Sequence, residues 1–154
     1  MDDSHGTVHL PTEADTRALG ARFGAELKVG DVVVLTGPLG AGKTMLAKGI
    51  AQGMDVEGAV TSPSYVLARV HPARRAGYPA MVHVDMYRLL DHAGTDLLGE
   101  LDSLDLDTDL ADAVIVVEWG EGIVERLSER YLDIRLERAA DTEARTAIWR
   151  WNRS

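Results

Sequence analysis

The sequence predicts an α/β fold in which helices flank a mixed β-sheet. Apolar strand-like runs alternate with helix-forming stretches in the first half of the 154-residue chain, as in folds that join parallel strands by helices. A glycine-rich segment connects one such run directly to a helix. Further along, two pairs of strand-like runs are separated by too few residues for a helix, so each pair is expected to be antiparallel. We therefore predict a parallel core with additional antiparallel strands, including a C-terminal hairpin.

The first half of the chain supplies two strands and two helices. In order, the sequence predicts a strand at 7–10, a helix at 12–26, a strand at 31–36 and a helix ending between 53 and 58. Thr12, followed three residues later by Asp15, is a typical helix-capping pair. In the second helix, Leu46, Ile50 and Met54 recur at the spacing of one helical face, which predicts that this face is buried.

The second half is predicted to consist mainly of strands. The expected elements are an extended run at 60–70, a strand at 81–85, short helices within 94–110, a strand at 113–118, a short helix at 122–127, and a hairpin of 131–137 with 146–151. The loop between the first two elements contains proline and arginine and is too short for a helix, so these strands are expected to pair. The run 113–118 is apolar except for its final acid, which is typical of a buried strand.

Composition favours a single domain that covers residues 1–154. The chain contains no cysteine, which excludes disulfides and thiolate metal sites and fits a reducing compartment. Its apolar runs are far shorter than the roughly 20 residues that span a bilayer, so we expect a cytoplasmic protein without membrane contact. A net charge of −9 and only three lysines argue against autonomous nucleic-acid binding, which requires clustered Lys and Arg. Any connection with RNA is therefore expected to run through a more basic partner.

Residues 37–44 read GPLGAGKT and match G-x-x-x-x-G-K-[ST], the phosphate-binding loop. Glycines let the backbone wrap a polyphosphate, so that successive N–H groups and the N-terminus of the following helix point at anionic oxygens. Lys43 is expected to meet the β- and γ-phosphates, and the Thr44 hydroxyl to hold Mg²⁺. The expected nucleotide contacts of the loop are Gly37, Leu39, Gly40, Ala41, Gly42, Lys43 and Thr44.

Two acids end apolar runs that should lie inside the sheet, Asp85 after 81–84 and Glu118 after 114–117. A nucleotide hydrolase needs a carboxylate beside its phosphate loop to orient the metal shell or the attacking water. We therefore expect at least one of these acids on the metal side. Thr61 lies where a switch segment would follow the second helix, although a helix- or turn-capping role explains it equally well. His83 is expected to share a face with Asp85, and we interpret it as a core residue rather than a base.

These segments together resemble the TsaE family, whose members are the small ATPases of bacterial tRNA threonylcarbamoyladenosine biosynthesis. The resemblance covers nearly the whole chain, and it is most specific in the YRL and EW elements. The segments that carry it are LPTE at 10–13, GPLGAGKT at 37–44, TSPSY at 61–65, HVDMYRL at 83–89 and VEW at 117–119.

The resemblance implies a P-loop NTPase fold, with ATP and Mg²⁺ as ligands and weak hydrolysis that depends on the TsaB–TsaD pair. By motif, Thr61 belongs to a switch-like segment, Asp85 to a Walker-B-like position and Glu118 to the metal side, while Glu13 matches a position near the nucleotide. tRNA is expected to be met only indirectly, through the TsaD and TsaB homologues. The implied catalytic residues are Lys43, Asp85 and Glu118, and the implied metal ligands are Thr44, Asp85 and Glu118.

Two other functions use the same loop. A small-molecule kinase would need an acceptor pocket and a lid whose arginines close over the phosphates, and the loop around Arg74 and Arg75 is the candidate for that lid. A nucleotide-gated binding module would bind ATP without meaningful turnover. Phosphorylated product would identify the first alternative, and unchanged ATP in the presence of TsaB–TsaD would identify the second.

Overall fold

The computed structural model describes residues 5–37, 42–57, 68–85, 113–118, 130–138 and 144–153. Within these ranges it confirms an α/β fold with a mixed sheet. The elements are β1 (His5–Leu10), α1 (Glu13–Glu26), β2 (Val32–Thr36), α2 (Lys43–Met54), β3 (Ala68–His71), β4 (Ala80–Asp85), β5 (Ala113–Glu118), β6 (Arg130–Arg138) and β7 (Arg145–Arg153).

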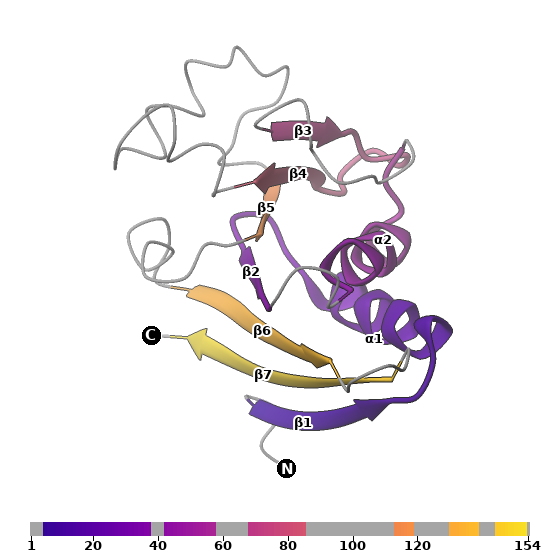
Figure 1. The fold of residues 1–154 in the computed structure, drawn as a ribbon. Coiled ribbons are helices and arrows are strands. Elements are labelled where there is room, and N and C mark those ends of the chain that lie inside the picture. Colours follow the sequence, from indigo (N-terminus) through magenta and orange to yellow (C-terminus); the bar gives the residue numbers. More distant parts are fainter. Residues whose placement is uncertain are drawn as a thin grey trace.

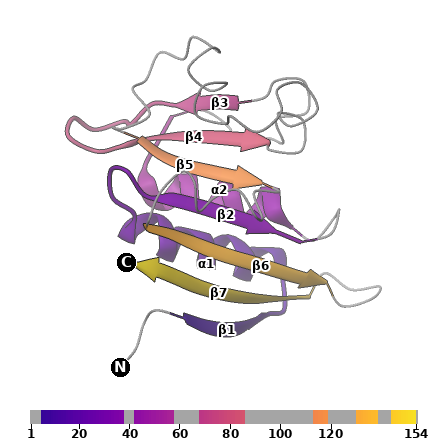
Figure 2. The same ribbon diagram turned by 90° about the vertical axis from the view of Figure 1, so that its left-hand side faces the viewer.

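The described strands form one sheet in the order β1-β7-β6-β2-β5-β4-β3, which Figure 2 shows from one end to the other. β6, β2, β5 and β4 are parallel to one another and form the core of the sheet. β3 pairs antiparallel with β4, and β7 pairs antiparallel with β6, so both predicted hairpins are confirmed. β1 pairs antiparallel with β7, so the first and last strands lie side by side (Figure 1).

α1 and α2 cover one face of this sheet (Figure 1). The core beneath them joins Leu46 and Ile50 of α2 with Val33 of β2, Val116 of β5 and Met81 of β4. Because strand residues alternate between faces, every second residue of these strands points toward the helices. In the described ranges, neither helix is long and apolar enough to cross a membrane.

The start of α1 follows the predicted capping pair. Thr12 is the N-cap, and its Oγ1 accepts a hydrogen bond from the backbone N–H of Asp15 at 3.2 Å. The Asp15 carboxylate in turn accepts from the backbone N–H of Thr12 at 3.0 Å. These reciprocal bonds satisfy two backbone donors that the helix would otherwise leave unpaired. The helix ends at Glu26, as predicted.

α2 ends at Met54, where Asp55 takes a left-handed conformation with φ of 58°. This end lies within the predicted range of 53–58, and Gly53 is still inside the helix, where it packs against α1. A Cβ on Gly53 would overlap the carbonyl oxygen of Ala21, and a Cβ on Gly49 would overlap that of Arg17. These glycines are therefore explained by the close approach of two helices.

Several predictions lie outside the described residues. They are the extended run before β3 at 60–67, the short helices within 94–110 and at 122–127, and the turn of the C-terminal hairpin near 140–141. The expectation of a single domain over residues 1–154 likewise stays a prediction.

Candidate functional site

The candidate site lies where three neighbouring parallel strands end. β2 ends at Thr36, β5 at Glu118 and β4 at Asp85. In the sheet register Glu118 pairs with Leu35 of β2 on one side and with Asp85 of β4 on the other. Crevices at the carboxyl ends of such strands are the usual ligand sites of open α/β sheets. The predicted position of both acids at strand ends is thus confirmed.

The glycines at the two described ends of the loop adopt backbone angles that other residues rarely take. Gly37 has a φ of 148° and Gly42 a φ of 99°. Gly42 is the N-cap of α2 and provides no side-chain cap. By helix geometry, the first N–H groups of α2 point out of its N-terminal end, a position that favours an anion.

Lys43, the first residue of α2, is 6% exposed. Its Nζ donates a hydrogen bond to the carbonyl oxygen of Gly37 at 2.7 Å. This bond joins the start of α2 to the residue that directly follows β2, so the two described ends of the loop are held together. A buried ammonium costs free energy unless it is hydrogen-bonded or paired with an anion, so this position suits a lysine that neutralises phosphate.

Glu118 and His83 form a buried pair beside the loop. The imidazole Nε2 of His83 donates to Oε2 of Glu118 at 2.6 Å, and the two residues are 0% and 6% exposed. Both lie on the face of the sheet that α2 covers, because Met81 and Val116, two residues before them, pack in the core beneath that helix. The carboxylate is therefore on the same side of the sheet as Lys43.

The oxygen donors of the site are of a kind that could hold the magnesium ion of a nucleotide. Mg²⁺ prefers oxygen ligands and is usually held by one or two carboxylates together with substrate phosphates. Thr44 and Glu118 supply a hydroxyl and a carboxylate of this kind. Among the residues that the structure describes, no group of three or more His, Cys, Asp or Glu side chains could hold a metal by itself.

Gly37, Gly42, Lys43 and Thr44 lie at the two described ends of the loop, and Glu118 ends β5, the strand that pairs with β2. The sequence predicted all five as site residues. Asp85 joins them by its backbone position, and its side chain lies outside what is described. The remaining predicted positions that fall outside the described residues are Leu39, Gly40, Ala41 and Thr61.

Glu13 is the exposed first residue of α1. α1 and α2 run in the same direction, since Arg17 contacts Met45 at 3.4 Å and Gly24 lies against Ile50 and Gly53. Glu13 is therefore at the same end of the helix pair as the phosphate-binding loop. Its contact with a nucleotide stays a prediction.

The sequence analysis left two features near the site unpredicted. His83 is buried, as predicted, but its bond to Glu118 depends on a strand pairing that no local pattern indicates. Arg145 opens β7, and its Nε lies 3.7 Å from where a Cβ on Gly42 would sit. The fold of the C-terminal hairpin thus carries a guanidinium group to the loop.

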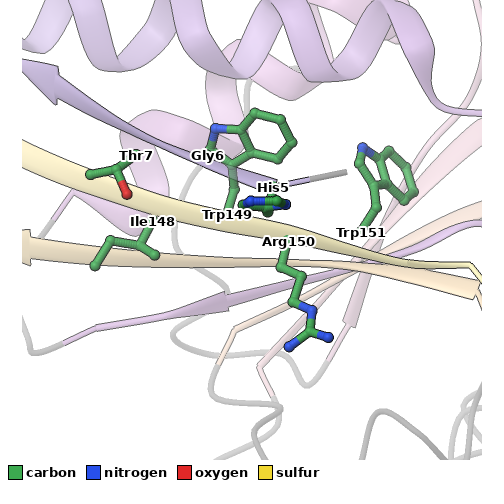
Figure 3. Close-up of a pocket in the computed structure, with 7 residues that line it drawn as sticks. All are labelled: His5, Gly6, Thr7, Ile148, Trp149, Arg150 and Trp151. Atoms are coloured by element: carbon green, nitrogen blue, oxygen red, sulfur yellow. The ribbon is translucent and has the colours of Figure 1, made fainter. Parts of the chain in front are cut away.

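A separate pocket of about 490 Å³ lies along β1 and β7. It is lined by residues 5–7 and 148–151, with Trp149 on the opposite side of β7 from Ile148 and Arg150 (Figure 3). Since β6 separates β7 from β2, this pocket is distinct from the candidate site.

A parallel sheet core, a glycine loop leading into α2 and an acid at the end of the adjacent strand define a protein of the P-loop fold class. A family model described as threonylcarbamoyl adenosine biosynthesis protein TsaE matches residues 10–147. The chain belongs to the TsaE family.

Individual relatives agree with this assignment. The chain is 68% identical over 149 residues to tRNA threonylcarbamoyladenosine biosynthesis protein TsaE of Mycobacterium bovis, covering 97% of this chain and 89% of the relative. The protein of the same name from Streptomyces coelicolor is 53% identical over 128 residues, covering 83% and 82%. Among solved structures, the crystal structure of Bacillus subtilis YdiB is similar with a TM-score of 0.71 and 28% identity, covering 97% of this chain and 86% of that one.

Proposed function

We propose that this protein is a magnesium-dependent ATPase that acts in the formation of N6-threonylcarbamoyladenosine in tRNA, as an accessory of a TsaB–TsaD complex. Membership of the TsaE family supports the pathway. The observation that carries the ATPase assignment is that Lys43, at the start of α2, bonds to Gly37 directly after β2, while Glu118 ends β5, the strand paired with β2. A cation and a carboxylate at this position are the parts that phosphoryl transfer requires.

Each residue has a role that follows from its position. Lys43 and the first N–H groups of α2 bind the phosphates and stabilise negative charge. Thr44 and Glu118 hold Mg²⁺, which supplies charge neutralisation at the phosphates when bound. Asp85, at the neighbouring strand end, assists the metal or orients water.

The surface charge supports an indirect relation to tRNA. At a net charge of −9, the protein lacks the excess of cations that neutralises nucleic-acid phosphates. We propose that homologues of TsaB and TsaD contact the tRNA, and that this protein works with them in the cytoplasm.

The positions of Arg74 and Arg75 argue against the kinase alternative, in which these arginines would form the lid over the phosphates. Arg74 and Arg75 form ion pairs with Asp55 at 3.7 and 3.1 Å, and Asp55 caps the C-terminal end of α2. A 12-residue helix is about 18 Å long, so these arginines lie one helix length from Lys43 at the opposite end. They are poorly placed to close over phosphates bound at the loop.

The test compares Lys43→Ala with Lys48→Ala, which removes the same charge from the same helix five residues further on. We expect Lys43→Ala to abolish ATP turnover, with and without the TsaB–TsaD pair, and to abolish the modified nucleoside in cells that depend on this protein. Lys48→Ala should retain both. Circular dichroism and thermal unfolding establish that both variants are folded.

Wild-type turnover in Lys43→Ala, or a normal level of modified tRNA, contradicts the proposal. ATP that binds but stays intact even with the TsaB–TsaD pair would instead identify a nucleotide-gated binding module.

A further inference from the structure

His83 is a fully buried polar residue for which the proposed chemistry so far provides no role. It is 0% exposed in the middle of β4, with buried Val82 and Val84 next to it in the chain and Val116 opposite it in β5. A buried imidazole in such a strand requires an explanation, because an aliphatic side chain would fill the same space without desolvating polar atoms.

The sheet register fixes where the His83 ring can reach. His83 pairs with Val116 of the parallel strand β5, and Glu118 is two residues further along β5 on the same face. The ring therefore meets the carboxylate diagonally, with Nε2 of His83 2.6 Å from Oε2 of Glu118. Backbone pairing along both strands holds the donor in this place, so the contact does not depend on a flexible loop.

The hydrogen bonding of the ring is one-sided. Within the described ranges, Nδ1 of His83 is buried and has no hydrogen-bond partner. Buried polar atoms are normally satisfied, and one that is not costs free energy. Core packing alone would not favour a histidine whose Nδ1 is buried without a partner. A need for an N–H donor at the Glu118 carboxylate would explain why a histidine stands here.

A carboxylate at the end of a strand has rotameric freedom unless a partner removes it. The bond from His83 occupies Oε2 and restricts rotation of the Glu118 side chain, so that Oε1 keeps one direction. Hydrogen bonds of this kind to metal-ligating groups are a general means of orienting them.

We propose that His83 is a positioning residue that fixes the carboxylate of Glu118 for Mg²⁺ by holding Oε2. This inference rests on the proposed function, in which Glu118 is a metal ligand. In this proposal β4 contributes two residues to the site, Asp85 at its end and His83 in its middle. His83 acts through Glu118 and does not need to touch the nucleotide.

The test uses two side chains of similar length and shape at position 83. His83→Gln retains an N–H donor at about the distance of Nε2, whereas His83→Met fills the space without a donor. We measure ATP affinity by calorimetry with Mg²⁺ and with EDTA, turnover with the TsaB–TsaD pair, and thermal unfolding. Should the methionine variant not fold, His83→Asn takes its place, because its shorter amide does not reach Glu118.

We expect the donor-free variant to lose about 10- to 100-fold in Mg²⁺-dependent ATP affinity or turnover, the usual range for removing a partner of a metal ligand. ATP affinity in EDTA should change by less than about twofold, because the phosphate loop is untouched. His83→Gln should recover most of the loss. In a Glu118→Gln background the same substitution should have no further effect on the magnesium dependence, since its target is already removed.

A folded His83→Met protein with wild-type magnesium dependence overturns the inference. Equal losses in the glutamine and methionine variants, in EDTA as well as with Mg²⁺, also overturn it, because they indicate a structural role only. If the wild-type protein itself shows no Mg²⁺–ATP binding or turnover, the proposed function fails, which separates that result from a failure at His83.

Discussion

At the scale of single residues, the site depends on a few positions where backbone shape or burial leaves little choice. Gly37 and Gly42 combine positive φ angles with positions at either end of the phosphate loop. Lys43 and Glu118 are charged groups that are almost completely buried, and each is held by a hydrogen bond within the described residues. Their geometry is therefore set before any ligand binds, which reduces the cost of ordering the site.

Gly42→Ala tests whether the loop conformation serves nucleotide binding. At Gly42 a Cβ would lie 3.7 Å from Arg145 Nε, an ordinary contact distance. The substitution therefore costs only the free energy of a left-handed φ in alanine, about 1 kcal/mol. Gly30 is the matched control, because its φ is 88° and a Cβ there has no neighbour within 4 Å. Both alanine variants should lose similar stability in urea unfolding.

Only Gly42→Ala should weaken ATP binding. Loss of one charge-assisted hydrogen bond to phosphate is worth about 1.5 to 3 kcal/mol, or about tenfold or more in affinity by calorimetry. Equal affinities for the Gly30→Ala and Gly42→Ala proteins would show that the conformation at Gly42 does not contribute to nucleotide binding.

At the scale of elements, the helix pair positions the loop. α2 begins with Lys43 and Thr44 at the end of the loop, and α1 packs along it through glycines on both helices. Small residues let the two backbones approach closely, so α2 is located by backbone contacts rather than by adaptable side chains. We therefore expect the position of the loop relative to β2 and β5 to be sensitive to this interface.

Gly49→Ala should destabilise the protein although alanine favours helix formation by about 1 kcal/mol. Its Cβ would overlap the Arg17 carbonyl oxygen and lie 3.0 Å from Cα of Gly20, and such overpacking typically costs about 1 to 3 kcal/mol. Gln52→Ala, on the exposed side of α2, should stay within about 0.5 kcal/mol of wild type. Denaturant unfolding followed by circular dichroism distinguishes the two, and a Gly49→Ala protein as stable as Gln52→Ala would contradict close packing.

At the scale of the whole molecule, the first and the last strand of the chain together form one edge of the sheet. β1 pairs only with β7 among the described strands, and Trp149 of β7 lies over Gly6 of β1, where a Cβ would be 2.8 Å from the indole. The same indole packs edge-to-face on Phe23 of α1 with ring centroids 5.4 Å apart. One side chain thus joins three elements that are distant in sequence.

Trp149→Ala should lower the free energy of unfolding by about 3 kcal/mol, the range for removing a large aromatic side chain from a packed site. Ile148→Ala is the control, because Ile148 is 40% exposed on the other side of β7 (Figure 3) and should cost about 0.5 kcal/mol. Thermal and urea unfolding measure both. Similar stabilities of the two variants would mean that the β1–β7 edge does not depend on the indole.

Local patterns were sufficient for much of this description. The capping pair of Thr12 and Asp15, the apolar strand that ends in Glu118 and the helix that begins at Lys43 are all confirmed where the sequence predicted them. Each signal lies within a few adjacent residues, because caps, strand alternation and glycine turns are governed by short-range sterics and hydrogen bonds.

The sequence by itself determined the kinds of the described elements, the antiparallel pairing in both hairpins, and the positions of the glycine loop before α2 and of the two acids at strand ends. Only the tertiary structure decided that β1 joins β7, that Arg145 reaches Gly42, and that His83 holds Glu118. These contacts join residues far apart in the chain, and they arise from the order and register of strands in the sheet. That order is set by the burial of whole faces rather than by any short run of residues, so no local pattern contains it.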